Sequence, residues 1–321
     1  MNAWAKEKSF FSNLLEPTAE VLSDRAQGMK KLIVTADDFG LTEKVNQGII
    51  EAHCRGIVTS TSLMANGGAF EDAVARAREA PRLGIGAHLN LTQGPTVTPP
   101  TVVRSLVNRE GEMGTGPIGL GKKIATGKVR LGEVELELRA QIEKILGAGI
   151  TLTHLDGHKH IQLLPGVFDI VLKLAREYGI KGIRCAVEPS SAFAVLKHAR
   201  RNGTGGIMQY GLGRALSLFA LRSRGKATRA GLLTPRYFLG IAQTGFLDIS
   251  ELSRILNNLP EGVSELMSHP GYVDEALART PTRLLGQRER ELGALTDPMA
   301  KDLIARNNVQ LISYRELSEA P

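Results

Sequence analysis

Short apolar segments alternate with helical patterns along most of this chain of 321 residues, and no other feature constrains the fold as strongly. Segments rich in β-branched and aliphatic residues predict strands, and apolar positions at helical spacing between them predict helices. Such alternation is typical of β-α crossovers and a mostly parallel sheet. About eight such units in one chain of this length favour a closed barrel over an open sheet. We therefore predict an α/β fold with a single irregular (β/α) barrel.

The predicted elements can be assigned to residue ranges. Strands are expected at residues 32–34, 57–64, 83–91, 150–155, 180–187, 237–242, 263–268 and 309–314. Helices are expected at residues 42–55, 70–79, 134–146, 165–178, 250–259, 283–295 and 298–306, with another centred on 215–221. Residues 92–130 are rich in Gly, Pro, Thr and Lys and predict a long irregular stretch. Loops of that length in a compact domain usually act as lids or binding loops.

We expect one folded domain, residues 29–321, preceded by a loosely ordered extension, residues 1–28. The extension lacks the basic, apolar and small-residue regions of a secretory signal. Cys54 and Cys185 are the only cysteines, which gives no disulfide framework and favours a reducing, cytoplasmic compartment. No apolar run approaches the roughly 18 residues that span a bilayer. A composition of 42% hydrophobic and 23% charged residues is ordinary for a soluble enzyme.

The net charge of +7 is concentrated in one part of the chain. Residues 189–243 contain nine Lys or Arg and no Asp or Glu. We therefore expect a basic insert at about 195–232 that meets an anionic partner, which could be a membrane surface, a phosphate or a nucleic acid. An aromatic content of only 5% argues against stacked single-stranded nucleic acid, and we predict no nucleic-acid binding. A solvated basic face without a ligand is the alternative.

The basic insert also predicts an amphipathic helix. Its apolar face combines Leu212, Ala215, Leu216 and Phe219, and its basic start and C-terminal flank hold Arg214, Arg222, Arg224, Lys226 and Arg229. Such a helix can lie at a membrane interface, so we predict peripheral, salt-sensitive binding at the inner face of the membrane. In the alternative, this face packs on the barrel or on the second subunit of a homodimer.

Two adjacent acids, Asp37 and Asp38, follow the first apolar strand. Paired carboxylates are costly at the end of a buried strand, because they repel each other and lose hydration unless a cation or donors compensate. In the alternative, one acid caps the next helix and the other points to solvent. Histidines and a further acid elsewhere in the sequence could bind the same cation, and they favour the first interpretation.

Three of the seven histidines lie within residues 153–160, THLDGHKH, beside one acid. A lone histidine is more often a core or surface residue than a ligand, but three histidines near a carboxylate pair favour a metal site. Imidazole and carboxylate ligands suit Zn²⁺, or Mn²⁺ and Mg²⁺ with more water. Three protein ligands with open positions would indicate a catalytic site. The candidates in this segment are His154, Asp156, His158 and His160.

Further polar residues stand near the ends of other predicted strands, and these ends converge at one mouth of a barrel. His88 and Asn90 share one face of their strand, and Arg184 ends another. His269 precedes Pro-Gly and suits a general acid, because an imidazole pKa near 6.5 fits that task. A turn histidine packed under proline is the alternative. The amides of Asn90 and Gln243 could donate hydrogen bonds.

Four of these segments together resemble the motifs of the YdjC-like carbohydrate deacetylases, which include chito-oligosaccharide deacetylases. The resemblance runs in order from about residue 31 to 315. A further segment, residues 238–245, and the basic insert resemble one branch of that family, the hopanoid biosynthesis-associated HpnK proteins. The four motif segments are residues 35–40 (TADDFG), 86–91 (GAHLNL), 153–160 (THLDGHKH) and 268–271 (SHPG).

The resemblance implies an irregular (β/α) barrel and metal-dependent removal of an acetyl group from an N-acetylated amino sugar. It implies that Asp38, His88 and His158 hold one divalent ion, Zn²⁺ or Mg²⁺/Mn²⁺, with Asp37 as general base and His269 as general acid. The branch and the basic helix together predict N-acetylglucosamine carried on a hopanoid lipid; a soluble chito-oligosaccharide is the alternative. Contacts to the substrate or support around the ion are expected from Asn90, His154, Asp156, His160, Arg184 and Gln243.

The chain departs from the chito-oligosaccharide members at Gly157, Lys159 and the basic insert, which leaves the sugar specificity open. Two functions of other classes compete with deacetylation. A glycosidase needs two carboxylates roughly 5–9.5 Å apart, whereas adjacent acids on a strand point to opposite sides and the histidines would have no role. A non-catalytic membrane- or nucleic-acid-binding protein would not need the Asp and His residues.

Overall fold

The protein is described by a computed structural model that covers residues 29–187 and 220–319. The predicted extension at residues 1–28 lies outside the described residues. So does most of the predicted basic insert, including the apolar face of its helix. Among the described residues, no helix is both long and apolar enough to cross a membrane.

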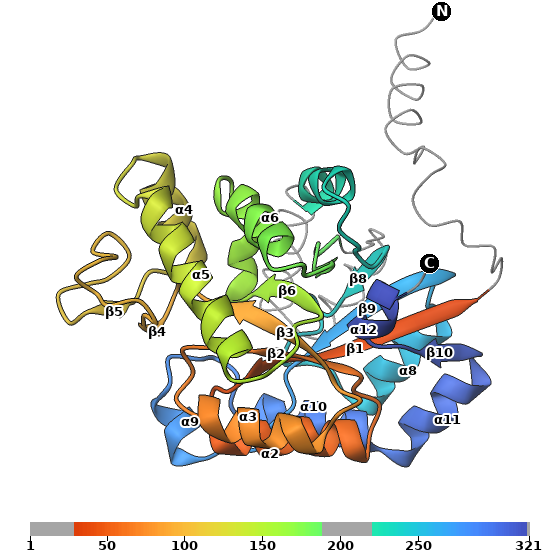
Figure 1. The fold of residues 1–321 in the computed structure, drawn as a ribbon. Helices are drawn as coiled ribbons and strands as arrows, with labels where there is room; N and C mark the ends of the chain where they lie inside the picture. Colours follow the sequence, from red (N-terminus) through yellow and green to blue (C-terminus); the bar gives the residue numbers. More distant parts are fainter. Residues whose placement is uncertain (1–28, 188–219, 320–321) are drawn as a thin grey trace, which may run out of the picture.

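One sheet of parallel strands forms the centre of the fold (Figure 1). Its order is β7-β6-β3-β2-β1-β9-β8, and β10 pairs with β1 in addition. The long strand β1 pairs in parallel with β2, β9 and β10. The strands are β1 (Lys30–Phe39), β2 (Ser60–Leu63), β3 (Gly84–Leu89), β6 (His154–Gly157), β7 (Gly182–Ile183), β8 (Tyr237–Leu239), β9 (Gly262–Ser268) and β10 (Val309–Leu311).

The two ends of the sheet are joined by the chain next to β7 and β8. Leu233 pairs in parallel with Gly182, and its N–H donates to the carbonyl of Lys181 at 2.8 Å. Farther along, the N–H of Phe238 donates to the carbonyl of Val187 at 3.1 Å. These bonds bring the sheet round on itself, although β7 and β8 form no regular ladder. The predicted irregular (β/α) barrel is confirmed.

Helices cover the outside of the barrel. Figure 1 shows α2, α3 and α10 on one side of the sheet, with α5 and α6 on the other. The first of them is capped by Thr42, whose hydroxyl accepts the N–H of Val45. These helices match the predicted ranges closely. They are α2 (Glu43–Cys54), α3 (Phe70–Glu79), α5 (Leu131–Gly147), α6 (Val167–Glu177), α8 (Ile249–Asn257), α10 (Gly286–Thr296) and α11 (Pro298–Arg306).

Some predicted boundaries were wrong. The strand predicted at 150–155 begins at His154 and ends at Gly157, and it therefore includes Asp156. The predicted strand 309–314 ends at Leu311, because a helix follows it. Two short helices, α9 (Glu275–Arg279) and α12 (Tyr314–Glu319), were not predicted. Both are too short to show a helical period in the sequence.

The stretch 92–130 is not irregular throughout. It contains a hairpin of β4 (Gly94–Pro95) and β5 (Glu112–Met113), and helix α4 (Pro117–Ala125). Two buried glutamates of α5 hold this stretch. Glu137 accepts the N–H groups of Val97 and Thr98, each at 2.9 Å, and Glu133 accepts that of Ser105 at 2.7 Å. The stretch is therefore anchored to the barrel along α5.

Residues 220–229 are helical, so the predicted helix does not end near Leu221. Four of the basic residues named for it, Arg222, Arg224, Lys226 and Arg229, lie on the helix and not beyond it. Ala220 and Ala227 are buried on its inner face. Lys226 pairs with Asp169 at 2.6 Å, so one of the basic charges has a partner within the protein. Arg222 and Arg229 are exposed.

Candidate active site

Asp37 and Asp38 stand at the end of β1 in an irregular piece of backbone. The pairing of β1 with β2 shifts register between Ala36 and Phe39, and Asp38 has a φ of 71°. In a regular strand, neighbouring side chains point to opposite faces. Here both carboxylates line the same cavity, so the expectation that they point to opposite sides is wrong. A left-handed aspartate is a strained conformation of the kind that gathers at functional sites.

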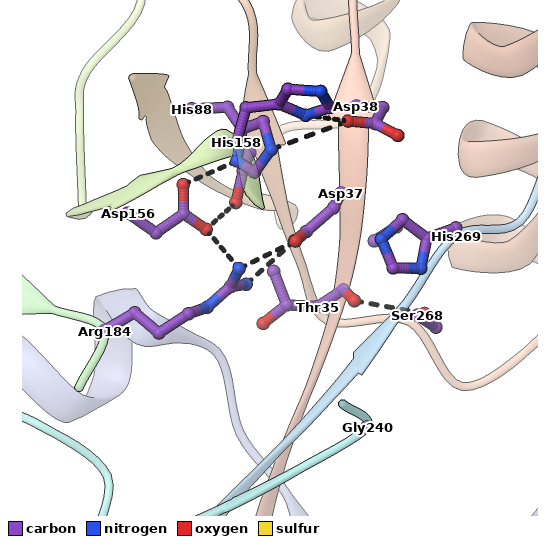
Figure 2. Close-up of polar contacts among 12 residues, drawn as sticks. Thr35, Asp37, Asp38, His88, Asp156, His158, Arg184, Gly240, Ser268 and His269 are labelled. Carbon is purple, nitrogen blue, oxygen red and sulfur yellow. Dashed lines mark hydrogen bonds and ion pairs between the residues drawn. The ribbon is translucent and has the colours of Figure 1, made fainter. Parts of the chain in front are cut away.

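Asp38 meets His88 of β3 and His158, which directly follows β6 (Figure 2). Its Oδ1 lies 3.1 Å from Nδ1 of His158 and 3.5 Å from Nε2 of His88. Each of these three residues offers one possible ligand atom, and the three atoms lie within 4.8 Å of one another, as the ligands of one ion would. The second oxygen, Oδ2, accepts a hydrogen bond from Arg288 at 2.5 Å. Although burial acts in the opposite direction, Arg288 and the histidines lower the pKa of Asp38 well below its usual value.

His88 is held from behind by Asp156. The two residues are register partners on β3 and β6, and Nδ1 of His88 lies 2.8 Å from Oδ1 of Asp156. Ser62 donates to the other oxygen of Asp156 at 2.5 Å. A carboxylate on one ring nitrogen fixes the orientation of the imidazole and leaves the other nitrogen for an ion. Burial lowers the pKa of His88, but Asp156 and Asp37 outweigh it and raise that pKa to about 10.

Arg184 is fully buried and serves three acids at once. Its Nη1 and Nη2 donate to the two oxygens of Asp37 at 2.7 and 2.8 Å. Nη1 also lies 2.8 Å from Asp156, and Nη2 lies 2.8 Å from Glu265. Asp37, His88 and Asp156 form a second group with ligand spacing, but the guanidinium already lies between its two carboxylates.

The charges of the buried cluster suit one divalent cation. When ionised, Asp37, Asp38, Asp156 and Glu265 carry four negative charges, and Arg184 and Arg288 carry two positive ones. With His88 neutral, as an ion ligand must be, two negative charges are left over among these groups. Nε2 of His158 is also buried, and no group among the described residues forms a hydrogen bond with it. Carboxylate and imidazole donors at this spacing therefore fit Zn²⁺ or a similar ion.

Asp37 is buried beside the cluster. Burial raises its pKa above the usual value, while Arg184 and His88 act in the opposite direction. Figure 2 shows the imidazole of His269 on the opposite side of Asp37 from Arg184. Burial lowers the pKa of His269 well below its usual value. The backbone N–H of His269 donates to Glu291 of α10 at 2.6 Å.

The other two histidines of residues 153–160 lie apart from the group of Asp38, His88 and His158. His154 stacks on Tyr314 with ring centroids 3.8 Å apart, and a side chain on Gly86 would overlap its ring. His160 lines the cavity and meets the ring of Phe238 edge-on at 5.8 Å. Burial lowers the pKa of both histidines to about 3, so both rings are neutral.

The predicted amides Asn90 and Gln243 do not line the cavity. The side-chain oxygen of Asn90 accepts the N–H of Thr92 at 2.9 Å, and its nitrogen donates to the carbonyl of Gln93 at 2.8 Å. Gln243 accepts the N–H of Gly240 at 3.1 Å. Both side chains therefore shape the backbone of turns near the site.

The cavity has a volume of about 670 Å³. Its polar lining includes Asp37, Asp38, His88, His158 and His269. Lys159 and His160, with φ of 54° and 58°, form part of its wall, and Lys159 donates to Gln93 at 2.8 Å. Much of the remaining wall is apolar: Pro117, Ile118, Leu163, Leu164, Pro165, Ile241, Met267, Pro281 and Leu284.

Four polar residues of the site were not singled out from the sequence. Arg288 and Glu291 lie on α10 in a highly charged pattern that indicates a surface helix, yet both side chains are buried. Glu265 shares one face of β9 with the apolar residues Val263 and Met267, and Ser62 lies among small hydroxyl residues on β2. Of these four, only Glu265 gave a usable signal, because a charged residue on the apolar face of a strand indicates a buried polar contact.

The chain is similar to known proteins along most of its length. The family described as YdjC-like protein matches residues 31–306. A carbohydrate deacetylase of Brevibacillus brevis (strain 47) is 35% identical, over 89% of this chain and 99% of that protein. Another, of Geobacillus stearothermophilus, is 34% identical, over 88% of this chain and 96% of that protein. A candidate cellobiose-phosphate cleavage protein of Enterococcus faecalis V583 has a crystal structure with a TM-score of 0.71 at 29% identity, covering 91% of this chain and 100% of that one.

Proposed function

The chain belongs to the YdjC-like protein family, and from this premise we propose that it is a carbohydrate deacetylase. In this proposal it hydrolyses the acetamide of an N-acetylated amino sugar. The observation that carries the proposal is the buried group of Asp38, His88 and His158 at the floor of the cavity, with Asp37 and His269 beside it. Such a set can bind an ion, accept a proton and donate a proton at one place.

Asp38, His88 and His158 would hold the ion. A divalent ion bound there would polarise the acetamide carbonyl and lower the pKa of a water molecule. Two further residues hold these ligands in position without the ion. Asp156 orients His88, and Arg288 binds the oxygen of Asp38 that faces away from the histidines. Zn²⁺, Mg²⁺ and Mn²⁺ are the candidates.

Asp37 is the proposed general base. Arg184 fixes both of its oxygens, but a carboxylate oxygen has two acceptor sites, so one remains for a water molecule. Burial favours uptake of a proton by this carboxylate. His269 is the proposed general acid, which would protonate the amine as the C–N bond breaks.

We propose N-acetylglucosamine carried on a hopanoid lipid as the substrate. The apolar wall of the cavity supports a substrate with an apolar part next to the sugar. Ile118, at the start of α4, is 72% exposed and extends this wall to the surface. A soluble chito-oligosaccharide is the alternative. The membership of the hopanoid-associated HpnK branch also stays a prediction.

The test is acetate release from a panel of N-acetylglucosamine conjugates, soluble and lipid-linked, by protein loaded with each candidate ion. We expect release that stops on chelation and returns when the ion is added back. Acetate release that survives complete removal of the ion would contradict the metal-dependent mechanism. Cleavage of the glycosidic bond without acetate release would favour a two-carboxylate glycosidase. Equal rates on lipid-linked and soluble conjugates would contradict the lipid-linked substrate.

A further inference from the structure

Glu291 of α10 joins two segments of the cavity wall. It is 1% exposed, and each of its oxygens accepts a backbone N–H: that of Gly245 at 2.7 Å and that of His269 at 2.6 Å. The first segment also carries Ile241 and Thr244, which line the cavity. The second carries the proposed general acid. One carboxylate therefore sets the distance between these two segments.

The same carboxylate faces the imidazole of His269. Its Oε2 lies 3.9 Å from Nδ1 of His269. This Nδ1 is buried and has no hydrogen-bond partner among the described residues. A shift of about 1 Å would bring the two atoms to hydrogen-bond distance. Catalytic hydrogen bonds are often long in the ligand-free state and shorten when substrate binds.

A charged imidazole at this position needs support from a carboxylate. Burial disfavours the charged form of His269, and the guanidinium groups of Arg288 and Arg184 act in the same direction. Asp38 acts in the opposite direction, but an ion on that carboxylate would cancel its effect. Glu291 lies next to this ring, with Oε2 3.9 Å from Nδ1.

We propose that Glu291 is a positioning residue for His269, which fixes its backbone and accepts a hydrogen bond from Nδ1–H. This inference rests on the proposed deacetylation. While the C–N bond of the substrate breaks, the proton moves from Nε2 of His269 to the amine nitrogen. The Nδ1–H bond to Glu291 stays intact throughout, so that the neutral imidazole left behind has one defined tautomer.

The kinetic test compares Glu291→Gln with Glu289→Gln, a matched change at an exposed position of the same helix. For each variant, kcat for acetate release is measured as a function of pH. The ion content and the melting temperature are measured on the same preparation. In Glu291→Gln we expect an unchanged ion content, a kcat lower by about 10- to 100-fold, and an alkaline limb of the pH profile that moves to lower pH. Glu289→Gln keeps the wild-type profile. A purely structural role would lower stability and leave the alkaline limb in place, and this result would overturn the proposal.

A second measurement does not depend on the variant folding or on any substrate. The ¹⁵N resonances of the His269 ring in the ion-loaded wild type, assigned by their loss in His269→Gln, report which nitrogen carries a proton. A proton on Nδ1 across the active pH range supports the proposal. An unprotonated Nδ1 overturns it, even if Glu291→Gln fails to fold. If no sugar conjugate releases acetate, the proposed function fails, and this spectrum still decides the role of Glu291.

Discussion

Arg184 binds both oxygens of Asp37, at 2.7 and 2.8 Å, in the closed interior of the barrel. The same guanidinium contacts Asp156 and Glu265, so it is the shared counter-charge of three buried acids. Removing one partner of a buried ion pair costs about 3–5 kcal/mol, because the other charge is left without compensation. The structure makes Arg184 important for stability as well as for the position of the proposed base.

The first prediction is that Arg184→Met destabilises the fold by at least about 3–5 kcal/mol. Urea unfolding at neutral pH measures the loss. Arg55→Met is the matched control, because the Arg55 side chain is 74% exposed in its pair with Glu51. An exposed pair contributes about 0–1 kcal/mol, so this control should unfold almost as the wild type does. Equal midpoints for both variants would contradict the network.

The second prediction concerns the ion. His158→Ala should weaken binding of the divalent ion by more than about 10- to 100-fold, since loss of a ligand costs at least as much as loss of its support. Equilibrium dialysis followed by elemental analysis measures the bound ion. His160→Ala is the control from the same segment and should keep the wild-type ion content. Full ion content in His158→Ala would remove His158 from the ligand set.

The third prediction separates chemistry from ion binding. Asp37→Asn should keep the fold and the ion but lose activity by about 10²–10⁴-fold, the usual contribution of general acid–base catalysis. Acetate release and ion content are measured on the same preparation. Asp302→Asn, at an exposed position of α11, should match the wild type. A fully active Asp37→Asn would mean that another group takes the proton from water.

The fourth prediction is a loss of stability in acid. His154 is buried and neutral, with its pKa lowered to about 3 by burial. The unfolded chain binds the proton with a pKa near 6.5, so stability is full above about pH 6.5 and falls as the pH drops toward 3. At pH 5 this one residue costs about 2 kcal/mol relative to pH 8.

Urea unfolding of wild type and His154→Gln between pH 8 and pH 5 tests this prediction. The difference in free energy of unfolding between the two pH values should shrink by about 2 kcal/mol in His154→Gln. His53→Gln, on the outer helix α2, is the matched control and should retain the wild-type difference. An unchanged difference in His154→Gln would mean that the buried ring gains a proton without cost.

The fifth prediction, peripheral membrane binding by the basic insert, is sharpened by the structure. Lys226 pairs with Asp169, and Arg224 donates to the carbonyl of Arg236, whereas Arg222 and Arg229 are exposed. We expect co-sedimentation with anionic liposomes at low salt that weakens when Arg222 and Arg229 become Ser. Arg104→Ser with Arg109→Ser, on the 92–130 stretch, is the control. Equal recovery of all three proteins in the supernatant would contradict membrane binding.

The sequence predicted the barrel and most of the residues gathered at its mouth. The alternation of strands and helices leaves few folds open, and polar residues at the carboxyl ends of parallel strands must meet at one mouth. Asp37, Asp38, His88, His158 and His269 were found in this way. For each of these residues, the local sequence predicts the strand near whose end it lies.

The tertiary structure decided what surrounds these residues. The left-handed backbone of Asp38 turns two neighbouring acids toward one cavity, and no local pattern predicts that departure from strand geometry. Arg288 and Glu291 look like surface charges because their helix is rich in charged residues. They are buried because this helix packs on the outside of the barrel with both side chains facing inward, where Arg288 contacts Asp38 and Glu291 accepts the backbone N–H of His269. Whether a charged side chain faces water or a counter-charge depends on contacts between distant segments, and sequence periodicity contains no information on those contacts.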